Sequence, residues 1–240
     1  MNLQFIKILM GGDLLRNLGA MLLRIVLALV LTGAYLHYLF EIDSILINIV
    51  WLLVMTACTT ICAIRSAHMR SMTFVFPLFI GMLAGLLVAG TLFMLCAGLF
   101  DNTLHARFLV PVAALMLSAM LTTCAMGTKD YRQSLMDGSD QYNFLVGNGA
   151  SHIEAVAPFV RKALESSVKQ MAESTGIIQL VAMPAMFGMM LVGCPPITAM
   201  KYQLFVLLAS ILSSLIALIL AIYLADKRLF DKFGRLNKEK

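Results

Sequence analysis

The chain has 240 residues, of which 60% are hydrophobic and only 13% are charged. A water-soluble domain of this size has no core large enough to hide so much apolar surface, so the composition excludes an ordinary soluble protein and predicts an integral membrane protein. The net charge of +5 at pH 7 is explained by a basic surface that faces anionic lipid, and no nucleic-acid partner is expected.

Six stretches are long and apolar enough to be membrane-spanning helices, since a spanning helix needs about 20 mostly apolar residues. They cover residues 17–40, 45–64, 73–99, 107–126, 176–193 and 203–225. The sequence therefore predicts an all-α, polytopic membrane protein with six transmembrane helices. The remaining segments are predicted to be an interfacial N-terminal segment (1–16), a cytoplasmic loop (127–175) and a basic cytoplasmic tail (226–240), which leaves four spans in 17–126 and two in 176–225.

The distribution of basic residues predicts the orientation of these spans. Most lysines and arginines fall in the N-terminal segment, the 127–175 loop and the C-terminal tail, whereas Arg107 and Lys201 are the basic residues on the opposite side. Basic residues concentrate on the cytoplasmic side of membrane proteins. We therefore expect a multi-pass protein of the plasma (inner) membrane with both termini in the cytoplasm.

Two pairs of small residues at a spacing of four lie inside the predicted spans. Gly81 and Gly85 would permit two helices to approach closely. Cys58 and Cys62 share one helix face, where they could bind a soft metal ion or contribute only small-residue packing. The first pair predicts a compact bundle, and the second leaves both interpretations open.

The sequence lacks the motifs of several enzyme classes. It contains no His-Glu-x-x-His, no Gly-x-Ser-x-Gly and no pair of intramembrane aspartates, so a membrane-embedded hydrolase is not expected, and no cofactor is expected either. The phosphate-binding pattern Gly-x4-Gly-Lys-Ser/Thr is also absent. All acidic residues fall in loops, tails or helix ends, which argues against a carrier coupled to protons or sodium through a buried carboxylate.

The long loop at 127–175 carries a helix start signal. The turn "GNGA" is followed by Ser151, with Glu154 three residues later, which is the pattern of a capping box. Pro158 suits the first turn of a new helix, so we predict a helix of about two turns followed by a second helix. This short helix is expected to expose Ile153 and Val156, either to a groove on a partner protein or to the bundle or membrane surface.

The fifth predicted span is interrupted by proline and rich in methionine. Pro184 removes a backbone hydrogen bond, which predicts a kinked helix beside a wet pathway. Met183, Met186, Met189 and Met190 cover one broad side of this helix. Thioether sulfur prefers soft cations, but methionine is also ordinary flexible packing, and both interpretations remain open.

The region from the loop to the last span resembles the FetB family of iron-export ABC transporter permeases. The resemblance is carried by "RKALESSVKQMAESTGIIQLVAMPAM" and "PPITAMKYQ", which contain Arg161, Leu180–Met186, Pro196 and Ala199–Gln203, and it extends from about residue 13 to residue 225. Upstream residues that also fit the family pattern are Arg24, Gly33, Tyr38 and Pro111. The family begins with one further membrane helix, and it has glutamine where this chain has Ala28.

The resemblance implies a permease subunit of an ATP-driven exporter for a metal ion such as iron, with ATP hydrolysis in a separate ABC ATP-binding subunit. The active unit would be a homodimer of permeases in membrane lipid, with one ATP-binding subunit on each. Candidate contacts to that subunit are Ser151, His152, Ile153, Glu154, Val156 and Arg161; candidates for the translocation pathway are Arg24, Met183, Pro184, Met186 and Met190. No metal-ligand set is assigned. The alternatives are a stand-alone channel or carrier for a small cation, which needs no ATPase, and a membrane scaffold.

Overall fold

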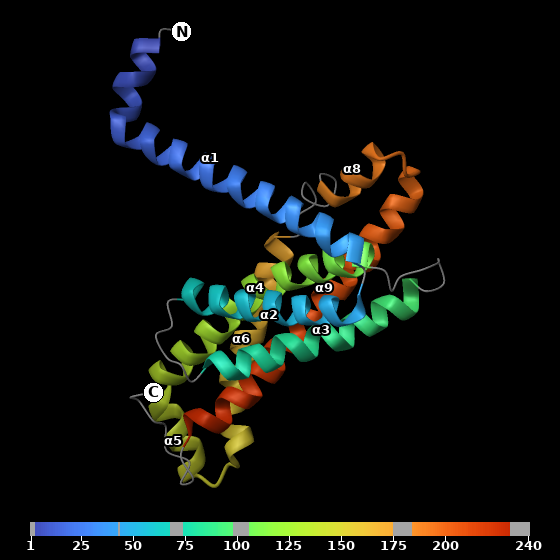
Figure 1. Cartoon of the computed structure of the whole chain (residues 1–240). Coiled ribbons are helices and arrows are strands. Elements are labelled where there is room, and N and C mark those ends of the chain that lie inside the picture. Colours follow the sequence, from blue (N-terminus) through green and yellow to red (C-terminus); the bar gives the residue numbers. More distant parts are fainter. Residues whose placement is uncertain (1–2, 43, 68–73, 98–105, 175–183, 231–240) are drawn as a thin grey trace. The chain divides into compact units, whose positions relative to one another are not determined.

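A computed structural model describes residues 3–42, 44–67, 74–97, 106–174 and 184–230 of the chain (Figure 1). The elements in this part of the chain are helices, which confirms the all-α class: α1 Leu3–Ile42, α2 Ile45–Ser66, α3 Val75–Ala97, α4 Ala106–Asp137, α5 Ser139–Gly147, α6 His152–Ser174, α8 Pro184–Leu191 and α9 Pro196–Leu229. The chain divides into two compact units, Met1–Asn48 and Ile49–Lys240, and each is described by itself.

Five helices among the described residues are long and apolar enough to cross a membrane. These stretches are Arg16–Ile42, Leu46–Ser66, Val75–Leu95, Leu109–Asp137 and Pro196–Leu229, and they make the chain a multi-pass membrane protein. Each overlaps one of the six predicted spans. The remaining prediction, 176–193, falls partly on residues 175–183, which lie outside the described residues; its described part is the eight-residue α8. A sixth crossing therefore stays a prediction.

In the first unit, α1 is one helix of 40 residues. From Leu3 on, the predicted interfacial segment 1–16 is thus continuous with the first span, because the chain before Arg16 contains no proline that would end the helix. From Arg16 to Ala34 the described side chains are all exposed, including many leucines and valines. Lipid is the solvent in which such a surface is stable.

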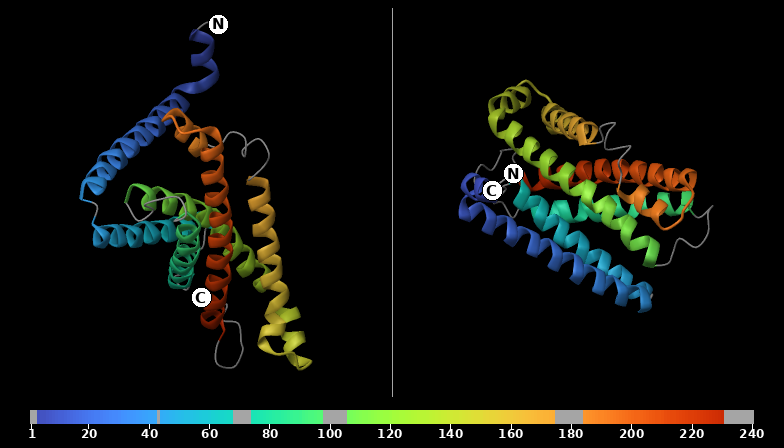
Figure 2. Two further views of the ribbon diagram at one scale, coloured as in Figure 1. Left: turned by 90° about the vertical axis from the view of Figure 1, so that its right-hand side faces the viewer. Right: turned by 90° about the horizontal axis from the view of Figure 1, so that it is seen from above.

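In the second unit, α9 packs along both α3 and α4 (Figures 1 and 2). The α3–α9 contact depends on Gly81 and Gly85, as their spacing predicted. A Cβ atom on Gly81 would lie 2.5 Å from the carbonyl oxygen of Ala217, and one on Gly85 would lie 2.5 Å from that of Ser213. The small residues on both helices bring the two backbones together, which is the usual packing mode of membrane helices.

α6 runs back along α4 in the opposite direction (Figure 2). Near the end of α4, a Cβ atom on Gly138 would lie 2.5 Å from the ring of Phe159; eleven residues earlier, one on Gly127 would lie 2.6 Å from the Ser167 Oγ. The buried side chains of α6 recur at helical spacing along one face: Ala155, Val156, Phe159, Ala163 and Ser167. This face explains why α6 is amphipathic.

The predicted break at Pro158 is wrong, since α6 continues through it from His152 to Ser174. Proline cannot donate to the carbonyl of Glu154, which costs one hydrogen bond. The apolar face that includes Val156 and Phe159 on either side of the proline is buried against α4, however, and tertiary packing outweighs a local propensity of this size.

The turn from α8 to α9 is closed by backbone hydrogen bonds. The Gly193 N–H donates to the Met190 carbonyl and the Cys194 N–H to the Met189 carbonyl, each at 3.0 Å, with Gly193 at φ +96°. This is the Schellman arrangement that ends many helices. Pro195 and Pro196 then begin α9, where a missing N–H costs nothing.

Candidate functional site

One end of the second unit is formed by α5 and the first two turns of α6, and we call these residues, 139–158, the α5–α6 tip. α5 ends in a Schellman arrangement, in which the Gly149 N–H donates to the Val146 carbonyl and the Ala150 N–H to the Leu145 carbonyl. Gly149 has a φ of +89°, which other residues rarely adopt. The tip therefore has a fixed backbone at the point where α6 begins.

The capping box at Ser151 is present. The Ser151 N–H and Oγ–H both donate to Glu154 Oε2 at 2.8 Å, and the Glu154 N–H faces the Ser151 Oγ at 3.4 Å. The Ser151 backbone hydrogen bond, followed by that of its side chain, lowers the pKa of Glu154 below its ordinary value. Glu154 is therefore an ionised carboxylate at the exposed start of α6, where the helix dipole also favours negative charge.

The side chains predicted to contact a partner divide into two sets. Ile153 is 79% exposed, and Ser151, Glu154 and Arg161 are also exposed. Arg161 forms an ion pair with Glu165 one turn further on, with 2.8 Å between Nε and Oε1. Val156, by contrast, is only 4% exposed, so the prediction that it faces outward is wrong: it belongs to the face that packs on the bundle.

His152, the first residue of α6, also turns toward the bundle. Its Nε2 lies 2.7 Å from Asp226 Oδ2 near the end of α9, and its Nδ1 lies 2.9 Å from the Tyr142 hydroxyl on α5. The hydroxyl of Tyr131, on α4, donates to the other oxygen of Asp226 at 2.9 Å. We call these four residues the tip network, and it joins α4, α5, α6 and α9.

Aromatic rings surround the tip network. The ring of Phe230, directly after α9, lies 4.6 Å from that of His152 and 4.9 Å from that of Tyr142, measured between centroids. Burial, and next the negative charge of Asp226, raise the pKa of Tyr142 above its ordinary value. The Tyr142 hydroxyl therefore keeps its proton at neutral pH and can donate it to a hydrogen bond.

The candidates for the translocation pathway are only partly described. Met183 lies outside the described residues. Pro184 is the first described residue of α8, so the predicted kink stays a prediction, and Met186 and Met190 are half-buried in the same helix. Arg24 is exposed in α1, in the first unit. A pathway lined by these residues stays a prediction.

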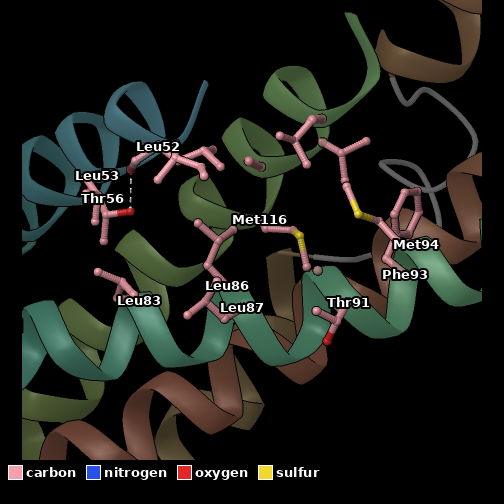
Figure 3. Close-up of a pocket in the computed structure, with 15 residues that line it drawn as sticks. Leu52, Leu53, Thr56, Leu83, Leu86, Leu87, Thr91, Phe93, Met94 and Met116 are labelled. Carbon is pink, nitrogen blue, oxygen red and sulfur yellow. Dashed lines mark hydrogen bonds between the residues drawn. The ribbon is translucent and has the colours of Figure 1, made fainter. Parts of the chain in front are cut away.

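Two cavities lie between the helices of the second unit. The larger, about 310 Å³, is lined by apolar side chains of α2, α3 and α4, among them Leu86, Met94 and Met116 (Figure 3). The smaller, about 180 Å³, lies where α4, α6 and α9 meet, and Thr122, Thr123, Met171, Gln203 and Ser210 contribute polar or sulfur atoms to it. Across the residues that the structure describes, no three His, Cys, Asp or Glu side chains gather into a potential metal site.

The tip network contains residues that the sequence interpretation did not select. Tyr131, Tyr142 and Asp226 belong to no motif, and Asp226 is 74 residues from its partner His152. One signal could have pointed to the two tyrosines: Tyr131 and Tyr142 are large aromatic residues in a loop predicted to face water, and both are buried in the structure. A buried tyrosine usually hydrogen-bonds through its hydroxyl group. The pairing itself depends on the packing of α6 between α4 and the end of α9.

The chain is similar to known membrane proteins over most of its length. The model of a family described as "Uncharacterised protein family (UPF0014)" matches residues 3–230. The "Probable iron export permease protein FetB" of Escherichia coli (strain K12) is 22% identical over 233 residues, which cover 96% of this chain and 86% of that protein. This similarity confirms the resemblance drawn from the sequence.

Two plant proteins match a shorter part of the chain. The "UPF0014 membrane protein STAR2" of Oryza sativa subsp. japonica is 26% identical, and the "Protein ALUMINUM SENSITIVE 3" of Arabidopsis thaliana is 24% identical, each over 132 residues. These regions cover 55% of this chain and 46% and 48% of the two relatives, respectively. No solved structure matches the chain at a significant level. With a family match from residue 3 to residue 230, the chain is a member of the UPF0014 family.

Proposed function

We propose that this chain is the membrane-spanning permease subunit of an ATP-driven metal-ion exporter of the plasma membrane, with iron as the first cargo to test. The name of the bacterial relative, which covers 96% of the chain, supports a permease that exports iron. The five apolar helices supply the membrane part of such a subunit. ATP would be hydrolysed by a separate ATP-binding subunit, because the sequence has no phosphate-binding loop.

The observation that carries this proposal is the exposed Ile153 at a helix start whose backbone is otherwise fixed. Ile153 is 79% exposed, and Phe144 on α5, nine residues earlier, is 69% exposed. We call these two residues the docking surface. An exposed isoleucine on a capped helix start, with an exposed phenylalanine on the preceding helix, favours a complementary apolar groove on a partner, and the exposed Glu154 and Arg161 of α6 could add polar contacts to it.

In this proposal, the ATP-binding subunit grips the docking surface and moves it when two such subunits close on ATP. Two permeases and two ATP-binding subunits form the active unit, and each bundle rocks between inward and outward access. The candidates for cargo contact are the methionines of α8, whose soft sulfur prefers soft or borderline cations. Both termini and the tip are cytoplasmic.

The test is Ile153→Asp, which places a charge in the centre of the proposed apolar contact. We expect the variant to insert normally, because the Ile153 side chain is 79% exposed, but to lose copurification with a candidate ATP-binding subunit that is expressed with it. Burying an unpaired carboxylate costs several kcal/mol. Val168→Asp is the matched control: it is an exposed apolar residue of the same helix, about 22 Å further along.

Efflux from proteoliposomes completes the test. The parent with its ATP-binding subunit should export iron only when ATP is present, and Ile153→Asp should not. Normal copurification of Ile153→Asp with the ATPase would remove the docking surface from the proposal. ATP-independent ion flux through the parent alone would replace the permease by the stand-alone channel or carrier.

A further inference from the structure

The start of α6 is tied to the end of α9 by a continuous chain of hydrogen bonds. From the α5 side, the chain runs from the Tyr142 hydroxyl to His152 Nδ1 (2.9 Å), from His152 Nε2 to Asp226 Oδ2 (2.7 Å), and from Asp226 Oδ1 to the Tyr131 hydroxyl (2.9 Å). Tyr131 and Tyr142 are buried, and the side chains of Asp226 and His152 are 18% and 39% exposed.

The chemistry of the four groups fixes the direction of these hydrogen bonds. An ionised carboxylate only accepts, so the Tyr131 hydroxyl and the His152 Nε2–H must both donate to Asp226. Nδ1 of a neutral His152 then lacks a proton and accepts from the Tyr142 hydroxyl. If His152 is protonated, Nδ1 donates to the Tyr142 oxygen instead, and the chain of contacts is preserved. The tip network therefore remains connected in both protonation states of the histidine.

The position of Ile153 gives this network a mechanical role. Ile153 follows His152 directly in α6, so the residue that points outward is adjacent to the residue bound to α9. Asp226 lies in the last turn of α9, the helix that packs on both α3 and α4. Charge-assisted hydrogen bonds are shorter and stronger than neutral ones, which makes the His152–Asp226 contact suited to transmit a displacement.

We propose that the tip network is the coupling link of the permease: it transmits movement of the docking surface to α9, and His152 and Asp226 are its positioning residues. The inference rests on the proposed function, and it adds the route within this chain. A push on Ile153 moves His152, and through Asp226 it moves the end of α9, together with Tyr131 of α4 that is bound to the same carboxylate, relative to α3. Without the link, the ATP-binding subunit would still bind the tip, but its movement would not reach the spans.

The experiment exchanges the two charged partners. His152→Asp places two carboxylates together, and Asp226→His leaves two imidazoles in contact; the double exchange restores one acid beside one imidazole. Each substituted side chain is compatible with the helix dipole at its position, because aspartate is favourable at the start of a helix and histidine near its end. Glu173→His, an exposed change elsewhere on α6, is the matched control.

The measured quantity is iron exported per ATP hydrolysed in proteoliposomes, together with copurification of the ATP-binding subunit. We expect both single exchanges to keep copurification and to lower the transport ratio about tenfold, as the loss of one charge-assisted hydrogen bond predicts. The double exchange should recover most of the parental ratio. Loss of copurification in Ile153→Asp with a normal ratio in the single exchanges would retain the docking surface and reject the link.

Other outcomes also decide the question. If the single exchanges lower the melting temperature and the double exchange restores stability without restoring the transport ratio, the network is structural and the proposal is overturned. If the parent neither binds an ATP-binding subunit nor exports iron when ATP is supplied to that subunit, the proposed function fails first. In that case, hydrogen exchange of α6 still reports whether the double exchange re-forms the contact.

Discussion

Methionine is the side chain through which the proposed preference for a soft cation can be tested. Met186 is half-buried in α8, two residues after Pro184, and it lies in the part of the sequence that resembles the FetB family. A thioether contributes little to binding hard cations such as Mg²⁺, whereas it can coordinate softer ions. If Met186 contacts cargo, its sulfur rather than its volume should matter.

Met186→Leu separates these two properties. The substitution keeps volume and apolarity, so we expect stability to fall by less than about 1.5 kcal/mol. Export of soft or borderline metals should fall while binding of the ATPase stays unchanged. Met200→Leu, an exposed methionine of α9, is the control. Equal efflux of iron, copper and zinc from both variants and the parent would leave the α8 methionines as packing residues.

For individual residues, the sequence predicted the capping box but not which side chains face outward. Ser151 and Glu154 signal a helix start through local chemistry, and local chemistry can be read from neighbouring residues. Ile153 and Val156 are both apolar, and only the position of α4 and α9 decides that Val156 is buried and Ile153 is exposed. The same applies to His152, whose partner Asp226 is distant in sequence.

Among the described helices, α3 and α9 approach each other closely at Gly81 and Gly85. Gly81→Ala would place a methyl group 2.5 Å from the Ala217 carbonyl oxygen, which forces the helices apart. We expect a loss of about 1–3 kcal/mol, as for other overpacked cores. The measurement is thermal unfolding of the purified protein in detergent.

Gly90 provides the matched control on the same helix. A Cβ atom there would meet nothing within 4 Å. Gly90→Ala should therefore gain about 1 kcal/mol or less from the higher helix propensity of alanine. Similar melting temperatures for Gly81→Ala and Gly90→Ala would contradict the close packing of α3 and α9.

The two glycines were recognisable from their spacing, whereas the continuity of α6 through Pro158 was not. Two glycines four residues apart lie on one face of a helix, so a neighbouring helix can approach that face closely. Whether a proline ends a helix depends on how much packing the flanking residues gain if the helix continues. Phe159 gains a contact with Gly138, the residue directly after α4, and that contact is not encoded in the local sequence.

For the whole molecule, the tip network places the α5–α6 tip and the end of α9 on the same side of the membrane. Lys201 lies near the opposite end of α9, about 38 Å from Asp226 along the helix, which exceeds the ~30 Å of a hydrocarbon core. Asn148 at the tip and Lys201 should therefore be on opposite sides.

Cysteine labelling tests this topology. In a background without the five native cysteines, Asn148→Cys should react with an impermeant thiol reagent from the cytoplasmic side and Lys201→Cys from the outside. Both positions are exposed. Labelling of both from one side would show that α9 does not cross the membrane, and labelling of Asn148→Cys from the outside would invert the predicted orientation.

Among the properties of the whole molecule, the number of membrane crossings was the hardest to predict from the sequence. Five spans can each be recognised from their own sequence, because a helix that crosses the membrane must itself be stable in lipid and is therefore mostly apolar. The return from the tip to the start of α9 is different: α6 already runs back along α4 as far as Met171, which shares a cavity with Thr122 and Thr123. The segment between α6 and α8 lies outside the described residues, so a crossing there stays a prediction.

The length of α9 determines how far a tilt at one end can reach. Its 34 residues extend about 51 Å, and Ser213, which faces Gly85 of α3, lies at the midpoint. A rigid rod held at its centre has two arms of about 25 Å. A rotation of roughly 10° about that contact would displace the two ends by about 4 Å in opposite directions, given the 1.5 Å rise of a helix. The contact of Ser213 with Gly85 is thus placed where a pivot of α9 would be. If α9 rotates about this contact, the end at Asp226 and the end at Pro196 move in opposite directions.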